Sequence, residues 1–144
     1  MPLADERLIV PRACVAEVVR YTRPTVESDA AEWILGQFSW NGRELPLISF
    51  EAMLGKPQPE MTGRTRVVVF HTTAERLKTR YFGLVTQGFP QLVRVNSEVL
   101  KLDDERGWSD DEPVICRVRM INEYPLIPDL EAIEKRIADS GRFV

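Results

Sequence analysis

The sequence has few of the residues from which metal centres and catalytic sites are built. Its 144 residues include one His and two Cys, and Cys14 and Cys116 lie far apart in the chain. This excludes a His-rich metal site and a CxxC pair. There is no basic excess either, because 19 Lys and Arg stand against 22 Asp and Glu, for a net charge of −3. That balance argues against a dedicated nucleic-acid binder, whose affinity comes mostly from basic residues.

Long apolar runs are also missing. No stretch approaches the roughly 18 consecutive apolar residues that a membrane-spanning helix needs. The first residues include Asp5 and Glu6 where a signal peptide is basic, and the apolar run after them is only Leu8–Val10. We therefore expect a cytoplasmic protein without direct membrane insertion. Cys14 and Cys116 lie among Val, Ile and Ala, which suits small buried thiols, although a disulfide between them remains an open alternative.

What is present is a series of short apolar segments separated by turn residues, the pattern of an all-β domain. Apolar residues make up 44% of the chain, enough for the core of a single domain spanning residues 1–144. The expected strands are Ala13–Val19, Trp33–Trp40, Arg43–Phe50, Arg66–Phe70, Tyr81–Val85, Leu92–Val95, Val99–Leu100 and Val114–Met120. In the last of these, alternation predicts that Arg117 and Arg119 point outward.

The clearest local signal is Asn41-Gly42 between two apolar segments. Asn-Gly tolerates a positive φ at both central positions of a type I′ turn, so we expect a β-hairpin here. Folding the chain at this turn pairs Phe38 with Leu45 on one face of the hairpin. Pro46 has no N–H to donate, so the second strand is expected to lie at a sheet edge or to be bulged at that residue.

Two helices are expected from capping residues. Ser49 can cap a single helical turn that Gly55 ends. Asp129 can cap a helix at the end of the chain. Three apolar residues share one face of that second helix: Leu130, Ile133 and Ile137.

Motifs that carry chemistry are scarce. The acidic segment Asp103–Pro113 does not fit a calcium-binding EF-hand loop, because Gly107 falls fifth where glycine is needed sixth. His71 follows a strand, and the sequence identifies neither a nucleophile nor an orienting acid for it. We therefore expect no catalytic residue, no metal ligand and no cofactor. A hydrolase that uses His71 is the weakest of the functions considered.

The alternative function is a small β-barrel that binds nucleic acid through the basic region 64–101. Between Lys56 and Lys101 the chain has eight basic and three acidic residues. The basic residues near Leu77, however, alternate with other side chains as on the wet side of a hairpin. A solvated surface therefore explains them better than a nucleic-acid groove.

Three segments together resemble the CheW-type chemotaxis coupling domain: Val15–Val19, Leu35–Phe50 and Phe82–Val85. Their order and spacing agree with that family, as does the closing helix that starts at Pro128. The second segment is most similar to the ChpC-like accessory coupling proteins of the Chp system, which controls type IV pili and twitching motility. Its most specific part is a glycine, Gly36, followed by the Asn-Gly turn and Pro46.

The resemblance implies a fold of two intertwined five-stranded SH3-like β-barrels with a short C-terminal helix. It also implies a non-catalytic signalling adaptor of chemotaxis or twitching motility. Such an adaptor links the cytoplasmic tip of a chemoreceptor to the regulatory domain of a CheA-type histidine kinase. Its partners would be these two proteins, with no nucleic acid.

The resemblance further identifies candidate partner-binding residues. Val15, Glu17 and Val18 match the family's Val-x-Glu-Ile/Val segment near the receptor-binding groove. Gly36 matches the glycine before the hairpin, and Asn41-Gly42 matches an Arg-Gly turn at the receptor-facing end. Asn41 replaces the family's Arg, which removes five N–H donors and a fixed charge from that position.

Two further departures from the family pattern concern strands. Only seven residues precede Leu8, where family members usually have an extra apolar strand. Either Leu8–Val10 supplies a shortened strand, or one barrel has an open seam that could accept a strand from a partner. Thr86-Gln87 stands where a Val-Asp pair is common.

Overall fold

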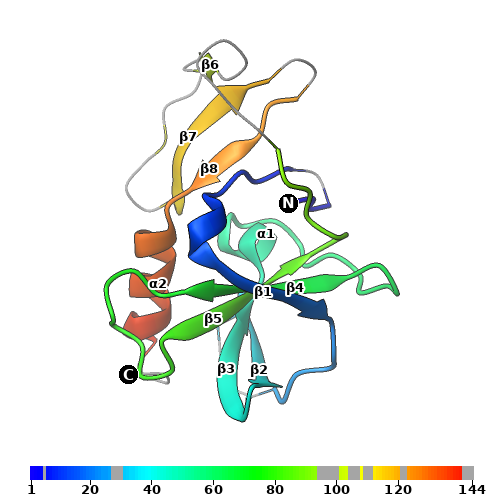
Figure 1. Ribbon diagram of the computed structural model, residues 1–144, viewed down its shortest axis with the longest axis vertical. Coiled ribbons are helices and arrows are strands. Elements are labelled where there is room, and N and C mark those ends of the chain that lie inside the picture. Colours follow the sequence, from blue (N-terminus) through cyan, green and yellow to red (C-terminus); the bar gives the residue numbers. More distant parts are fainter. Residues whose placement is uncertain are drawn as a thin grey trace.

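A computed structural model describes residues 1–4, 6–26, 31–93, 101–103, 108, 112–120 and 123–140. Most of the regular structure in these residues is β, arranged as two sheets with a helix near the C-terminus (Figure 1). The elements are a 3-10 turn (Arg12–Cys14), β1 (Val15–Arg20), β2 (Ile34–Trp40), β3 (Arg43–Ile48), α1 (Phe50–Met53), β4 (Arg66–His71), β5 (Tyr81–Thr86), β6 (Lys101–Asp103), β7 (Val114–Arg119), β8 (Leu126–Pro128) and α2 (Leu130–Asp139). This architecture confirms the predicted mostly β fold with a short helix near the C-terminus.

The first sheet has five strands in the order β1-β4-β5-β3-β2. All neighbouring strands are antiparallel except β3 and β5, which are parallel. The segment after β1 reaches the outer side of β2, where Thr25 and Gln37 exchange two backbone hydrogen bonds of 2.9 Å. This contact connects the two ends of the sheet and curls it towards a barrel.

The hairpin of β2 and β3 has the predicted register, in which Phe38 pairs with Leu45. The prediction for Pro46 is wrong, because β3 is an interior strand and the bulge lies in β2, between Ile34 and Gly36. The parallel pairing of β3 with β5 begins at Leu47, one residue after Pro46. Pro46 therefore lies in the part of β3 that pairs only with β2, where its missing N–H leaves no hydrogen bond to β5 unmade.

The second sheet has the order β6-β7-β8 among the described residues. The N-terminal segment extends it, since Leu126 donates to the Arg7 carbonyl over 2.8 Å and Ile9 donates to the Leu126 carbonyl over 2.9 Å. Leu8 thus forms a parallel bridge with Leu126. The predicted shortened strand at Leu8–Val10 is thus present only as this single bridge, and residues 9 and 10 are not in a strand.

Two predicted strands fall partly or wholly on residues 94–100, which lie outside the described part of the chain. The described residues of the first, Leu92 and Val93, are not in a strand. Most of the acidic segment Asp103–Pro113 also lies outside the described residues. The strand expected at Ala13–Val19 begins later, at Val15, because residues 12–14 form the 3-10 turn.

The core consists of two apolar clusters, one on each side of the first sheet. Phe38, Leu45 and Val67 belong to the cluster inside the curl of the sheet. The other cluster joins the first sheet to both helices and the N-terminal segment, and includes Phe50 and Ile133. Each strand of the sheet's centre is therefore covered on both faces, as the apolar run of β4 predicted.

Both helices begin as predicted. The Ser49 side chain accepts a hydrogen bond from the backbone of Ala52 over 3.2 Å, and Gly55 follows α1 with φ of 82°. The Asp129 side chain accepts from the backbone of Ala132 over 3.0 Å at the start of α2. On α2, Ile133 and Ile137 are fully buried and Leu130 is half-buried. Neither helix in the described part of the chain is long and apolar enough to cross a membrane.

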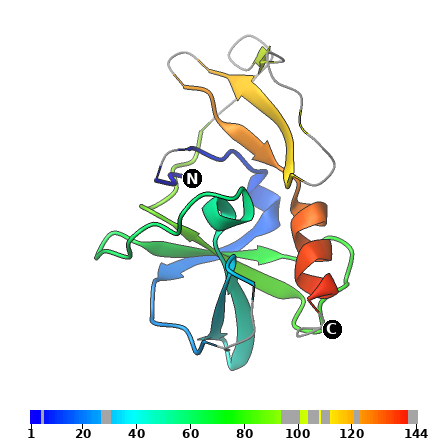
Figure 2. The ribbon, with the colours of Figure 1, turned by 180° about the vertical axis from the view of Figure 1, so that it is seen from behind.

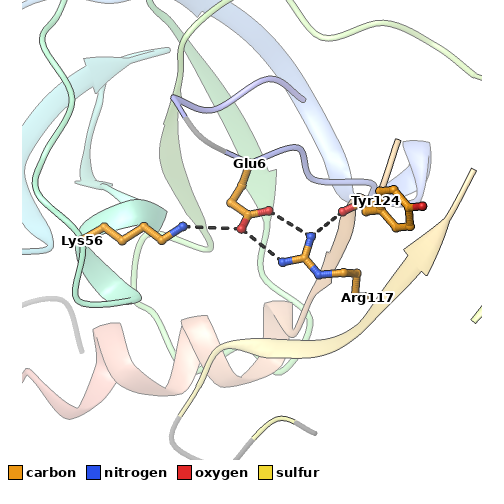
Figure 3. Close-up of polar contacts among 4 residues, drawn as sticks. All are labelled: Glu6, Lys56, Arg117 and Tyr124. Atoms are coloured by element: carbon orange, nitrogen blue, oxygen red, sulfur yellow. Dashed lines mark hydrogen bonds and ion pairs between the residues drawn. The ribbon is translucent and has the colours of Figure 1, made fainter. Parts of the chain in front are cut away.

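One side-chain prediction, for Arg117, is wrong, and the structure also decides between the two alternatives for the cysteines. Arg117 does not point freely into solvent, because it folds against the N-terminal segment and pairs with Glu6 (Figure 3). Arg119, in contrast, is exposed as expected. Cys14 and Cys116 are both half-buried free thiols, so the disulfide left open by the sequence does not form.

Candidate functional site

A groove in the described part of the chain lies where β1 faces the N-terminal segment and the second sheet. Its volume is about 690 Å³. Val15 and Val18 form the wall from β1, and Leu8 and Met120 contribute from the opposite side. The position of β1 at the end of the first sheet leaves these valines half-buried, with one side accessible from the groove.

The groove has an exposed apolar margin formed by the segment after β5. Phe89 and Leu92 line the groove and are 65% and 74% exposed, and Val93 beside them is 51% exposed. Large apolar side chains that gather at the edge of a hollow are typical of a surface that binds another molecule. The sequence reading missed Phe89 as a site residue, because exposure depends on how distant segments pack.

Charged groups also line the groove. Arg7 pairs with Glu123 over 3.2 Å, and Arg12 lies at the start of the 3-10 turn. The Met1 ammonium donates to the Leu8 carbonyl over 2.9 Å. Burial, and then the nearby charge of Arg7, lower the pKa of this ammonium from its usual value of 8.0.

Glu17 and the β2–β3 hairpin form a second group of candidate residues, separate from the groove. The Trp40 indole N–H donates to the Glu17 carboxylate over 2.6 Å, which ties the end of β2 to β1. Asn41 and Gly42 are exposed and have φ of 47° and 74°, as a type I′ turn requires. The turn therefore places an amide side chain and a bare backbone at the surface. None of these residues lines the groove.

Aromatic rings surround this second group of residues. The ring centroids of Trp40 and Tyr81 lie 4.8 Å apart. The ring centroids of His71 and Tyr81 lie 5.2 Å apart. His71 is exposed, and among the described residues it makes no hydrogen bond or ion pair to an acidic side chain. The geometry therefore gives His71 a ring contact and no orienting acid of the kind a general base needs.

Gly36 is buried and lies beneath the surface. Its φ is 139°, and an added Cβ would stand 2.3 Å from the Thr25 carbonyl oxygen. Glycine is therefore required for the contact between Thr25 and Gln37 that curls the first sheet. The six candidate residues thus lie in three places: Val15 and Val18 in the groove, Glu17 with the Asn-Gly turn at the hairpin, and Gly36 inside.

The described residues hold no group of three or more His, Cys, Asp or Glu side chains placed to bind a metal ion. The groove itself combines an apolar lining with a charged rim. Such a surface suits recognition of another protein.

Comparison with known proteins agrees with this architecture. The CheW-like domain family matches residues 1–136, so the chain belongs to the CheW-like family. Among solved structures, the crystal structure of the scaffolding protein TtCheW from Thermoanaerobacter tengcongensis has the same fold, with a TM-score of 0.70 at 17% sequence identity. The match covers 88% of this chain and 83% of that one. No curated protein sequence matches the chain.

Proposed function

We propose that this protein is a non-catalytic scaffold of chemotaxis-type signalling that links a chemoreceptor to the regulatory domain of a CheA-type histidine kinase. Membership of the CheW-like family supports the scaffold role. The observation that carries the proposal is the groove, in which Val15 and Val18 face an exposed apolar margin. These are residues that the family resemblance assigns to receptor binding.

The groove suits the apolar face of a receptor helix. A helix is about 10 Å across and presents its apolar residues three and four positions apart. Such a stripe can contact Val15 and Val18 on one side and Phe89 on the other. The charged rim around Arg7 and Glu123 can select the register of a helix with polar flanks.

The hairpin provides the second binding surface in this proposal. Glu17, Asn41 and Gly42 lie outside the groove, so a receptor helix in the groove leaves them free for a second contact, with the receptor or with the kinase. Binding two partners at once raises their effective concentration and fixes their geometry without any chemical step. The similarity to ChpC-like proteins leads us to propose the type IV pilus system as the pathway. A receptor, a kinase and a response regulator encoded beside this protein would support that assignment.

The receptor part of the proposal is tested by titrating the protein with a receptor-tip fragment. Leu92→Glu places a charge at the exposed margin of the groove without disturbing the core, because Leu92 is 74% exposed. Val26→Glu is the matched control, since Val26 is 69% exposed and does not line the groove. The proposal predicts that only Leu92→Glu weakens binding. Equal binding by both variants would contradict it.

A further inference from the structure

A second hollow of about 450 Å³ lies beside the hairpin, apart from the groove. Its walls come from the start of β3 and from the loop between β4 and β5. Five residues line it: Arg43, Glu44, Lys78, Thr79 and Arg80. None of them lines the groove, so the two hollows are separate surfaces.

This hollow is strongly positive for a chain whose net charge is −3. Arg43, Lys78 and Arg80 are all exposed. Glu44 is the one carboxylate of the lining, and its oxygen accepts a hydrogen bond from the Ser39 hydroxyl. Three cations with one engaged carboxylate leave a local surplus of positive charge.

The loop that carries Lys78 and Arg80 is hydrogen-bonded through its backbone to a buried carboxylate of α2. Glu134 is fully buried and accepts hydrogen bonds of 3.0 Å from the backbone N–H groups of Thr73, Ala74 and Arg76. The Thr73 hydroxyl adds a bond of 3.2 Å. In both views the loop lies beside α2 (Figure 1, Figure 2). Hydrogen bonds to an ionised carboxylate are strong, so the backbone of this loop is fixed.

The same loop keeps two residues in an unfavourable backbone conformation. Glu75 and Arg80 have φ of 54° and 62°, in the left-handed region that residues with a Cβ rarely adopt. Leu77 between them is only 2% exposed and holds the loop on the core. Strain of this kind persists where the surroundings impose it, and it concentrates at binding and catalytic sites.

Arg43 is also held in place, by groups of the neighbouring strand and loop. Its guanidinium lies 5.5 Å from the centre of the Tyr81 ring and donates to the Thr79 carbonyl over 3.3 Å. The Tyr81 ring in turn packs against the Trp40 ring. A cation supported by an aromatic ring loses less freedom when it binds an anion.

We propose that this hollow is a docking site for an acidic segment of a partner protein. Planar guanidinium groups bind carboxylates through paired hydrogen bonds, and Lys78 adds a third positive charge beside them. A nucleic acid is the poorer fit, because its affinity rests on a long basic stripe and three cations next to Glu44 do not form one. The site is independent of the receptor groove, and either can fail without the other.

The test is an NMR titration of the intact protein with hexaglutamate at low and at high salt. The proposal predicts saturable binding that weakens as salt rises. It also predicts that the backbone signals of residues 43–44 and 78–80 and the Trp40 indole signal shift, while those of the groove do not. Hexathymidylate is titrated in parallel as the nucleic-acid comparison.

Charge-neutralising variants locate the site. Arg43→Gln with Lys78→Gln is expected to weaken hexaglutamate binding by more than about tenfold, because the loss of one hydrogen bond to a charged group already produces about that ratio and this variant removes two cations. Arg23→Gln with Arg64→Gln is the control, since these exposed cations carry the same charge and do not line the hollow. Both pairs replace exposed side chains, and the spread of the NMR signals reports that each variant is folded.

Three results would overturn the proposal. The first is no saturable binding of hexaglutamate. The second is an equal loss in both double variants, which would show attraction by overall charge alone. The third is tighter binding of hexathymidylate at the same residues, which would assign the hollow to nucleic acid.

Discussion

Glu6 and Arg117 form a bidentate ion pair that joins the N-terminal segment to β7 of the second sheet (Figure 3). The two oxygens of Glu6 lie 3.1 and 3.2 Å from the guanidinium nitrogens of Arg117. The Lys56 ammonium, just after α1, approaches the same carboxylate at 3.5 Å. Arg117 also donates to the Tyr124 carbonyl over 2.7 Å. The Glu6 carboxylate therefore connects the N-terminal segment to the second sheet and to the segment that follows α1.

We predict that Glu6→Gln destabilises the protein by about 1.5–3 kcal/mol, the range for hydrogen bonds to charged groups. The side chains of Glu6 and Arg117 are only 16% and 23% exposed, so solvent screens this pair weakly. Urea unfolding measures the change. Arg7→Gln is the control, because its pair with Glu123 is exposed and should contribute less than about 1 kcal/mol. Equal effects of the two variants would contradict the role given to Glu6.

Glu134→Gln should loosen the loop between β4 and β5. In the natural protein both carboxylate oxygens accept hydrogen bonds from backbone N–H groups of the loop. The glutamine amide keeps only one acceptor oxygen, and its NH2 group is a donor that faces other donors. We expect a loss of about 1–3 kcal/mol in the free energy of unfolding. Hydrogen exchange should also accelerate at the amides of Thr73, Ala74 and Arg76. Asp139→Asn, an exposed change at the end of the same helix, should leave this exchange unchanged.

Gly36→Ala tests whether the curl of the first sheet depends on a bare backbone. A Cβ at this position collides with the Thr25 carbonyl. The backbone φ of this residue is also one that residues with a side chain rarely adopt. The backbone strain alone should cost about 1–3 kcal/mol. Gly63→Ala is the control, because nothing lies within 4 Å of a Cβ added there. Thermal unfolding of the two variants measures the difference, and similar midpoints would contradict the requirement for glycine.

Asn41→Arg tests what the departure from the family's Arg-Gly turn means. Restoring the guanidinium returns five N–H donors to an exposed turn that the structure already shapes correctly. If the hairpin binds a partner, this variant should bind a receptor or kinase fragment at least about fivefold more tightly than the natural chain. Binding by calorimetry is the measurement. No change in affinity for either fragment would remove the turn from the proposed binding surface.

The sequence predicted those parts of the fold that depend on neighbouring residues. Asn41-Gly42 specified the hairpin and its register, because a type I′ turn leaves one alignment. Asp129 and Ser49 specified helix starts through their own side-chain hydrogen bonds. Such signals need no knowledge of distant segments.

The parts that the sequence did not predict depend on distant contacts. Arg117 looked like an outward charge in an alternating strand, and its partner Glu6 stands at the other end of the chain. Glu134 lies on the apolar face of α2 with Leu130 and Ile137, but a carboxylate is rarely buried, and its partners are loop amides about 60 residues away in the chain. Pro46 suggested an edge strand, and only the register with β5 shows how an interior strand tolerates it.

Two of the residues that line the groove were already candidates in the sequence. Val15 and Val18 were identified through the family resemblance, and the structure places both in the groove. The groove's exposed margin at Phe89 was missed, since no local pattern distinguishes an exposed aromatic from a core one.

The central claim is that one copy of this protein holds a receptor and a kinase together. Sedimentation of the protein with a receptor-tip fragment and the regulatory domain of the cognate kinase tests it directly. The account predicts one complex containing all three, in which receptor and kinase domain sediment together only when this protein is present. If the two partners exclude each other, or if neither associates with the protein, the account is contradicted.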